Sequence, residues 1–247
     1  MHRWAELTGP ALRALFADDP ACVALIPVGA TEQHGPHLPV GTDTILATAI
    51  SDAAAARGGA IVLPPVPVGA SWWHGTELGG TLALAGERVA ELVVEHVRWA
   101  AHTGVRRVLF VNGHVGNTAP LWVACDRLRF EHPDLRVGVL EWWRLTPAIT
   151  AEVTVDAEDW HAHRAETALM LAIAPELVDL TAAKVADDPD RTAGLVFRYA
   201  VGQVSHTGVT GRPSEATVEL GERLWADVVA AAREVVARAR VERPPLR

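Results

Sequence analysis

Four continuous apolar runs, each beside a glycine or a proline, dominate the hydrophobic pattern of the chain. They cover residues 22–29, 59–66, 106–113 and 136–143. A short apolar run without alternating polar residues predicts a strand that is buried on both faces of its sheet. The pattern therefore predicts a sheet that is covered on both sides.

Segments with helical spacing lie between and after these runs. The first predicted helix begins at Asp43 and ends at Gly58, where the start and stop signals agree. Further helices are predicted over residues 86–104, 117–133, 165–178 and 214–240, and a long loop is predicted over 181–213. Strands that alternate with helices predict an α/β fold with a mostly parallel, doubly wound central sheet.

The composition is that of a soluble globular protein. The 247 residues fit a single domain over residues 1–247, and 49 % hydrophobic residues allow a sizeable core. The net charge of −8 argues against nucleic acid or an anionic membrane as a partner. No apolar stretch reaches the roughly 18 residues that a membrane span needs.

The cellular compartment is predicted from two further features. The N-terminal residues lack a basic segment followed by an apolar core, so no secretion signal is expected. Cys22 and Cys125 each lie in an apolar context, which is typical of buried thiols in a reducing compartment. A cytoplasmic location is therefore expected.

Several potential metal ligands follow the first apolar run within a turn-rich loop. Glu32 and His34 are two residues apart, so both side chains can face one point in an extended chain. Asp43 stands at the start of the next predicted helix, and His114 follows the third run. Because parallel strands present their carboxyl ends at one edge of the sheet, Glu32, His34 and His114 are expected to meet there.

This mixed set of carboxylates and imidazoles suits zinc, manganese or iron(II) better than calcium or magnesium. A carboxylate can bridge two ions in binuclear hydrolytic sites. Ordinary explanations stay open for single residues: Asp43 could be only a helix N-cap, and His37 only a partner behind the ligands.

A second cluster lies in residues 158–170. His161 and His163 precede Glu166, which falls in the first turn of a predicted helix. Glu166 is either a capping residue or a further metal ligand, and in the second case His161 is a candidate proton donor or acceptor beside the metal.

Taken together, these motifs resemble the creatininase family of metal-dependent amidohydrolases. The matching segments are 27–43, 111–117, 161–180 and, more weakly, 206–217. The resemblance implies a three-layer α/β/α fold, hydrolysis of C–N bonds in amides and cyclic amides, and a homo-oligomer, often a hexamer. It also implies a divalent metal centre, with two ions per subunit and zinc expected before manganese or iron.

The resemblance also assigns roles by position. The family's metal positions fall on Glu32, His34, Asp43 and His114, with Asp43 as the bridging ligand, and its catalytic histidine falls on His161. Creatininase itself carries a metal-binding glutamate two residues after the histidine of its "NGH" motif, where this chain has Gly116. Glu166 would then have to complete the second metal site.

The substrate-binding residues are expected to differ from those of creatininase. His163 replaces a small residue and is expected at the pocket wall. Trp73, His74 and Trp143 follow predicted strand ends and are candidates for an aromatic wall around the substrate, although tryptophan is more often a core or interface residue.

The predicted function is hydrolysis of a small amide or lactam by metal-activated water, with His161 as the acid and base. A peptidase of the mycofactocin type, which trims a modified precursor peptide, and a formamide deformylase remain alternatives within the family. A catalytically idle, metal-binding scaffold subunit remains the non-enzyme alternative. The chain has no G-x-S-x-G nucleophile motif and no nucleotide-binding glycine motif.

Overall fold

The computed structural model describes residues 2–246 and contains a five-stranded, fully parallel sheet. Its strands, in spatial order, are β1 (His2–Arg3), β3 (Ala60–Val62), β2 (Val23–Val28), β4 (Arg107–Asn112) and β5 (Arg136–Glu141). The predicted parallel sheet is confirmed. The strand expected over 59–66 stops at Val62 because Pro64 and Pro65, which lack a backbone N–H, follow closely.

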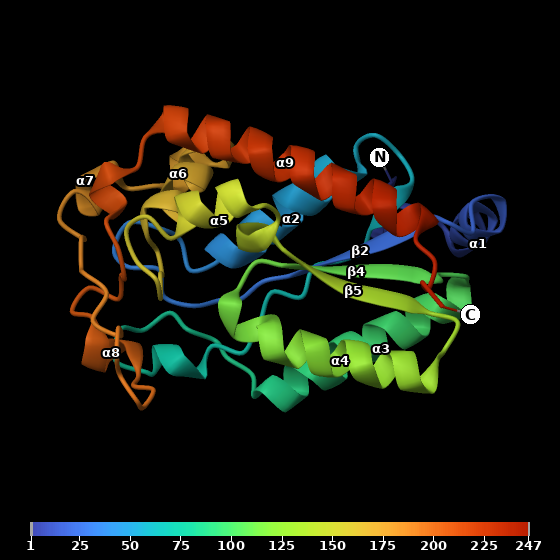
Figure 1. Ribbon diagram of the computed structural model, residues 1–247, viewed down its shortest axis with the longest axis horizontal. Helices are drawn as coiled ribbons and strands as arrows, with labels where there is room; N and C mark the ends of the chain where they lie inside the picture. Colours follow the sequence, from blue (N-terminus) through green and yellow to red (C-terminus); the bar gives the residue numbers. More distant parts are fainter. Residues whose placement is uncertain (1, 247) are drawn as a thin grey trace.

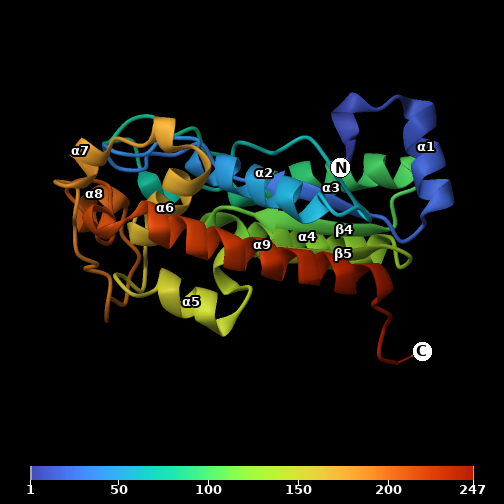
Figure 2. The same cartoon turned by 90° about the horizontal axis from the view of Figure 1, so that it is seen from above.

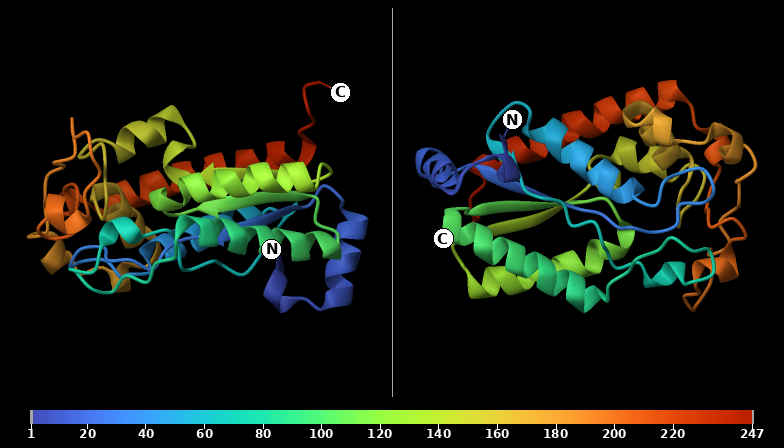
Figure 3. Two further views of the ribbon diagram at one scale, coloured as in Figure 1. Left: turned by 90° about the horizontal axis from the view of Figure 1, so that it is seen from below. Right: turned by 180° about the vertical axis from the view of Figure 1, so that it is seen from behind.

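Helices cover both faces of the sheet, which confirms the three-layer α/β/α prediction (Figure 1). One face carries α2 (Thr42–Ala55), α5 (Pro147–Val153), α6 (Arg164–Ile173) and α9 (Val218–Val241). The other carries α3 (Gly86–Thr103) and α4 (Thr118–Glu131), and Figure 3 shows this pair from behind. Within the described residues, no helix combines the length and apolarity that crossing a bilayer requires.

The side chains of β2 show how the two layers form. Val23 and Leu25 belong to the apolar cluster under α2 and α9, whereas Ala24, Ile26 and Val28 belong to the cluster under α3 and α4. All five side chains are fully buried, and successive side chains of the strand pack alternately against the two helical layers.

Two helices of seven or more residues lie outside the ranges that the sequence predicts. They are α1 (Gly9–Asp18) and α5, and each begins after a threonine whose hydroxyl accepts a backbone N–H, Thr8 and Thr146 respectively. The helix expected over 165–178 ends at Ile173 because Pro175 interrupts it. The expected long loop over 181–213 is mostly irregular, and the short helices α7 (Leu180–Ala183) and α8 (Val201–Val204) lie in or next to it.

The carboxyl ends of the central strands lie next to one another. Val28 pairs with Asn112, and Asn112 pairs with Glu141, so β2, β4 and β5 finish in register. Figure 2 shows α7 and α8 at one end of the molecule and α1 at the other. The expectation that the segments after β2 and β4 meet at one edge is confirmed.

Candidate metal centre

Glu32 and His34 occupy the loop that connects β2 to α2. The backbone N–H of Glu32 donates to the carbonyl of Val40 (2.9 Å), and Gly35 turns the chain with φ +63°. These contacts fold the loop back on itself, and the side chains of Glu32 and His34 are completely buried.

Asp43 lies in the first turn of α2, but it does not cap the helix. The N-cap residue is Gly41, and no side chain closes the helix start. Instead, Oδ1 of Asp43 lies 3.4 Å from Nε2 of His34, and Oδ2 lies 3.6 Å from Nδ1 of His114. A Cβ at Gly113 would lie 2.2 Å from the carbonyl oxygen of Asp43, so glycine is required for this approach of β4 to α2.

The two imidazoles are oriented by backbone carbonyls. Nδ1 of His34 donates to the carbonyl of Glu32 (3.2 Å), and Nε2 of His114 donates to the carbonyl of Ala70 (3.2 Å). The opposite ring nitrogens then face carboxylates: Nε2 of His34 faces Asp43, and Nδ1 of His114 lies 3.2 Å from Glu32. A carbonyl that fixes the far nitrogen is the usual arrangement around a metal-ligating histidine.

Glu166 completes the cluster from the first turn of α6. Its Oε1 lies 3.7 Å from Nε2 of His34, and its Oε2 lies 3.4 Å from Nδ1 of His163. Since Glu166 is 1 % exposed and points inward, its position is not that of a solvated capping residue.

Among the described residues, two of three possible ligand triplets share the carboxylate of Asp43, and the third consists of Glu32, His34 and His161. Glu32, Asp43 and His114 form one triplet, in which the ligand atoms lie within 4.8 Å of one another, and His34, Asp43 and Glu166 form the other. Both oxygens of Glu32, Nε2 of His34 and Oδ2 of Asp43 are buried without a hydrogen-bond partner. Buried carboxylate and imidazole atoms without hydrogen bonds are unfavourable, so this donor set fits bound cations.

The crowding of charges perturbs the pKa values of the cluster. Burial and the charge of Glu32 raise the pKa of Asp43 to about 7. Burial alone would lower the pKa of His114, but attraction to Glu32 and Asp43 outweighs it and raises the value to about 9. Protons on Asp43 and His114 would therefore compete with metal ions for the same ligand atoms.

His161 lies beside both triplets. Its Nε2 donates to the carbonyl of Gln33 (2.8 Å), which leaves Nδ1 unprotonated, 3.7 Å from Oε1 of Glu32. Burial and repulsion from His74 and His34 lower its pKa well below the usual value. Its backbone pairs with Thr210, which ties the 206–217 segment to the site.

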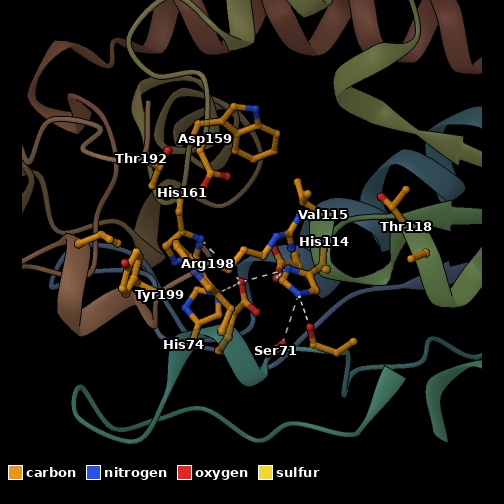
Figure 4. A pocket seen from close by; sticks show the side chains of 18 of the residues that line it. Ser71, His74, His114, Val115, Thr118, Asp159, His161, Thr192, Arg198 and Tyr199 are labelled. Atoms are coloured by element: carbon orange, nitrogen blue, oxygen red, sulfur yellow. Dashed lines mark hydrogen bonds and ion pairs between the residues drawn. The ribbon is translucent and has the colours of Figure 1, made fainter. Parts of the chain in front are cut away.

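A cavity of about 550 Å³ opens over the cluster. Figure 4 shows His74, His114 and His161 converging on it, with Ser71, Asp159, Arg198 and Tyr199 around them. Nε2 of His74 lies 3.0 Å from Oε1 of Glu32. Trp73 also lines the cavity.

Two predicted substrate residues lie behind the wall rather than in it. His163 is fully buried and donates from Nε2 to the carbonyl of Val153 (2.9 Å), and Trp143 is 4 % exposed. Neither side chain lines the cavity, so their expected place at its wall is corrected. Trp160, which packs between them, reaches the cavity instead and stacks on His163 at 4.7 Å.

His37 is separate from the ligand cluster. Its Nε2 lies 2.9 Å from Oγ1 of Thr167, one residue after Glu166, and burial lowers its pKa to about 4. The structure therefore places a buried imidazole against the first turn of α6, outside the ligand triplets.

Comparison with known proteins places this geometry in a family. The family model described as "Creatininase: Creatinine amidohydrolase" matches residues 5–236. The chain belongs to the creatininase family. The family assignment that the motifs indicated is thereby confirmed, and with it membership among hydrolases that act on C–N bonds.

The relatives in this family are named for different substrates, a precursor peptide and creatinine. The mycofactocin precursor peptide peptidase of Mycolicibacterium smegmatis is 37 % identical over 216 residues, which is 84 % of this chain and 81 % of the relative. The creatinine amidohydrolase of Pseudomonas putida is 34 % identical over 69 % of this chain and 71 % of its own length.

Solved creatininases share the fold over almost the whole chain. A crystal structure of creatinine amidohydrolase superposes with a TM-score of 0.86 at 29 % identity and covers 98 % of both chains. Two others, at 30 % identity and TM-scores of 0.83, are described as a mutant of Zn-Zn type and as a manganese form; each covers 97 % of this chain and 98 % or 99 % of its own.

Gly116 lies directly beside His114 of the cluster. A Cβ at this position would lie 2.4 Å from Nε2 of His114 and 2.4 Å from the carbonyl oxygen of Ala70. With this backbone there is no room for a side chain at residue 116. Glu166, in contrast, lies in the cluster.

Proposed function

We propose that the chain, acting as one domain over residues 1–247, hydrolyses a C–N bond of an amide with two divalent metal ions. Glu32, Asp43 and His114 would hold one ion, and His34, Asp43 and Glu166 the other. The observation that carries this proposal is the pair of triplets with Asp43 in common. The bound ions would lower the pKa of a water molecule to about 7 and polarise the substrate carbonyl.

The proposed metal is zinc, with manganese or iron as alternatives. Imidazole and carboxylate ligands suit all three ions. Relatives described as zinc and manganese forms support the first two.

His161 is the proposed acid and base. Because its Nε2–H is held by the Gln33 carbonyl, the free Nδ1 is the atom that can accept a proton from the attacking water. The same atom can then return that proton to the leaving nitrogen. Its lowered pKa keeps the ring neutral before the reaction, which a base requires.

A small amide or lactam is the first substrate class. Trp73, Trp160 and His74 give the cavity a partly aromatic wall that fits a flat ligand. A peptide amide is the second candidate, because the relatives named as mycofactocin precursor peptide peptidases match most of this chain.

Removal and replacement of metal test the proposed function. Activity against a panel of lactams, formamides and short peptides is expected to disappear with a chelator and to return with zinc or manganese. Mass spectrometry should show that the product has gained one water molecule. Hydrolysis by metal-free protein, or none by protein with two ions bound, would contradict the proposal.

Zinc binding is expected to tighten as the pH rises from about 7 toward about 9. Below about 9 the ion must displace the proton of His114, and below about 7 also that of Asp43. The dissociation constant should therefore fall by up to about tenfold per pH unit for each proton released. Calorimetry in buffers of different ionisation enthalpy counts these protons, and an affinity independent of pH would exclude His114 as a ligand.

Gly116→Ala is expected to weaken zinc binding by about 10- to 100-fold, since the new methyl group would intrude on the hydrogen bond that orients His114. Competition with a chromophoric chelator measures the affinity. Gly9→Ala is the control, because a Cβ there meets nothing within 4 Å. An unchanged affinity would mean that the orienting bond does not matter.

We further propose a homo-oligomer, with the hexamer favoured by the family resemblance, and a cytoplasmic location. Large apolar side chains on α3 and α4 support an interface: Trp99 is 72 % exposed and Phe130 is 87 % exposed. The net charge of −8 speaks against nucleic acid or an anionic membrane as a partner.

A further inference from the structure

The outer wall of the cavity is formed by residues 192–199, which have no regular secondary structure. Leu195, Phe197 and Tyr199 contribute apolar and aromatic surface to it, and Arg198 contributes a positive charge. These four side chains are exposed although they face a cavity, so the protein itself leaves them available for a ligand.

The charges in the cavity single out Arg198. The other arginine there, Arg144, lies 3.3 Å from Oε2 of Glu141 and is therefore paired. Arg198 has no carboxylate oxygen within 4.0 Å among residues 2–246. Asp159 also lines the cavity; burial raises the pKa of its carboxyl, and the charge of Arg198 partly offsets this without an ion pair between the two side chains.

Arg198 also lies at the right place relative to the metal cluster. It lines the same cavity as His74, His114 and His161 (Figure 4). A guanidinium without an ion pair, which lines the same cavity as Glu32, Asp43 and Glu166, is available to bind an anionic group of the substrate. Guanidinium binds carboxylate through two parallel hydrogen bonds, which fixes orientation as well as charge.

We infer that Arg198 binds a carboxylate of the substrate, and that the substrate is an amide bearing this carboxylate beside a hydrophobic group. The inference rests on the proposed function, whose substrate class it narrows. The carboxylate could belong to a small lactam acid or to the free C-terminus of a peptide. Arg198 would be a specificity residue and would take no part in proton transfer.

The test compares acids with their uncharged carboxamides on zinc-loaded protein. The lactam pair is 5-oxoproline and 5-oxoprolinamide, and the peptide pair is N-acetyl-leucyl-phenylalanine with a free or an amidated C-terminus. Dissociation constants come from calorimetry, and kcat and KM are recorded separately for any probe that is hydrolysed. The pair that shows a preference for the acid identifies the source of the carboxylate.

Arg198→Gln is expected to weaken binding of the preferred acid by about 10- to 100-fold and to leave its carboxamide unaffected. Arg198→Lys should keep part of the preference, because lysine retains the charge without the two parallel bonds. Arg88→Gln is the matched control: it removes an arginine that pairs with Glu91 on α3, and it should change nothing.

Two results would overturn the inference. One is equal binding of acid and carboxamide by the wild type in both pairs. The other is a preference for the acid that survives Arg198→Gln, since the carboxylate would then be bound by the metal ions. A preference that is lost in Arg198→Gln, without hydrolysis of any probe, would support the carboxylate site and reject the hydrolase proposal.

Discussion

Asp43→Asn should abolish hydrolysis, with a loss of about 10³-fold or more, and reduce the metal content from two ions per chain to at most one. Asp43 belongs to both ligand triplets, so its loss disturbs both ions at once. Metal assistance contributes several kcal/mol to transition-state stabilisation, and each 1.36 kcal/mol is about a factor of ten in rate. Metal analysis and turnover of the amide panel measure the two effects.

The same substitution should stabilise the metal-free protein above about pH 7. The pKa of Asp43 is raised from 3.8 to about 7, so its ionisation opposes folding as the pH rises through this interval. Asparagine cannot ionise and does not incur this penalty. The melting temperature of metal-free Asp43→Asn should therefore exceed that of metal-free wild type. Together with lost activity, this result would show that the variant has lost a metal ligand and has not misfolded.

Asp126→Asn is the matched control for Asp43→Asn. Asp126 lies on the exposed face of α4, and its ion-pair partner among residues 2–246 is Arg129. The Asp126→Asn variant should retain both metal ions and full activity. Two bound ions in Asp43→Asn would contradict the bridging role.

His161→Ala should lower kcat by about 10²- to 10⁴-fold while both ions remain bound. The imidazole lies beside the triplets, and His114 and His34 keep their own orienting carbonyls without it. Turnover and metal analysis of the same preparation test this separation. His96→Ala, on the exposed side of α3, is the control.

Two outcomes for His161→Ala would change the assignment. Loss of an ion would make His161 a ligand, which its grouping with Glu32 and His34 permits geometrically. Undiminished turnover would mean that another residue acts as the acid and base. His74, whose Nε2 lies 3.0 Å from Oε1 of Glu32, would be the next candidate.

The ligand cluster could be anticipated because its positions depend on local rules. Strands that are apolar throughout predict a parallel sheet, and a parallel sheet brings the residues after β2 and β4 to one edge. Glu32, His34 and His114 were therefore expected at the same edge whatever the order of the strands, and the pairing of β2 with β4 brings them together. The place of Glu166 was less certain, because it depends on how α6 packs against α9.

The cavity wall could not be anticipated, because it depends on long-range packing. Trp143 and Trp160 are both aromatic residues near the site, and only the packing of α5 and α6 determines which one reaches the cavity. Arg198 lies in a stretch without periodicity, and nothing in its sequence neighbours indicates that it turns toward the metal cluster. The starts of α1 and α5 did carry a signal, a threonine followed within two residues by a proline, that the hydrophobic pattern alone does not reveal.

Because Asp43 belongs to both ligand triplets, the number of metal ions bound per chain would indicate whether the chain has folded completely. The ligands come from the loop after β2, the start of α2, the end of β4 and the start of α6, so only a chain that reaches from residue 32 to residue 166 can supply both triplets. A chain released from synthesis before α6 has formed would lack Glu166 and one of the two sites. Occupancy by two ions would thus distinguish mature molecules from incomplete ones without any substrate.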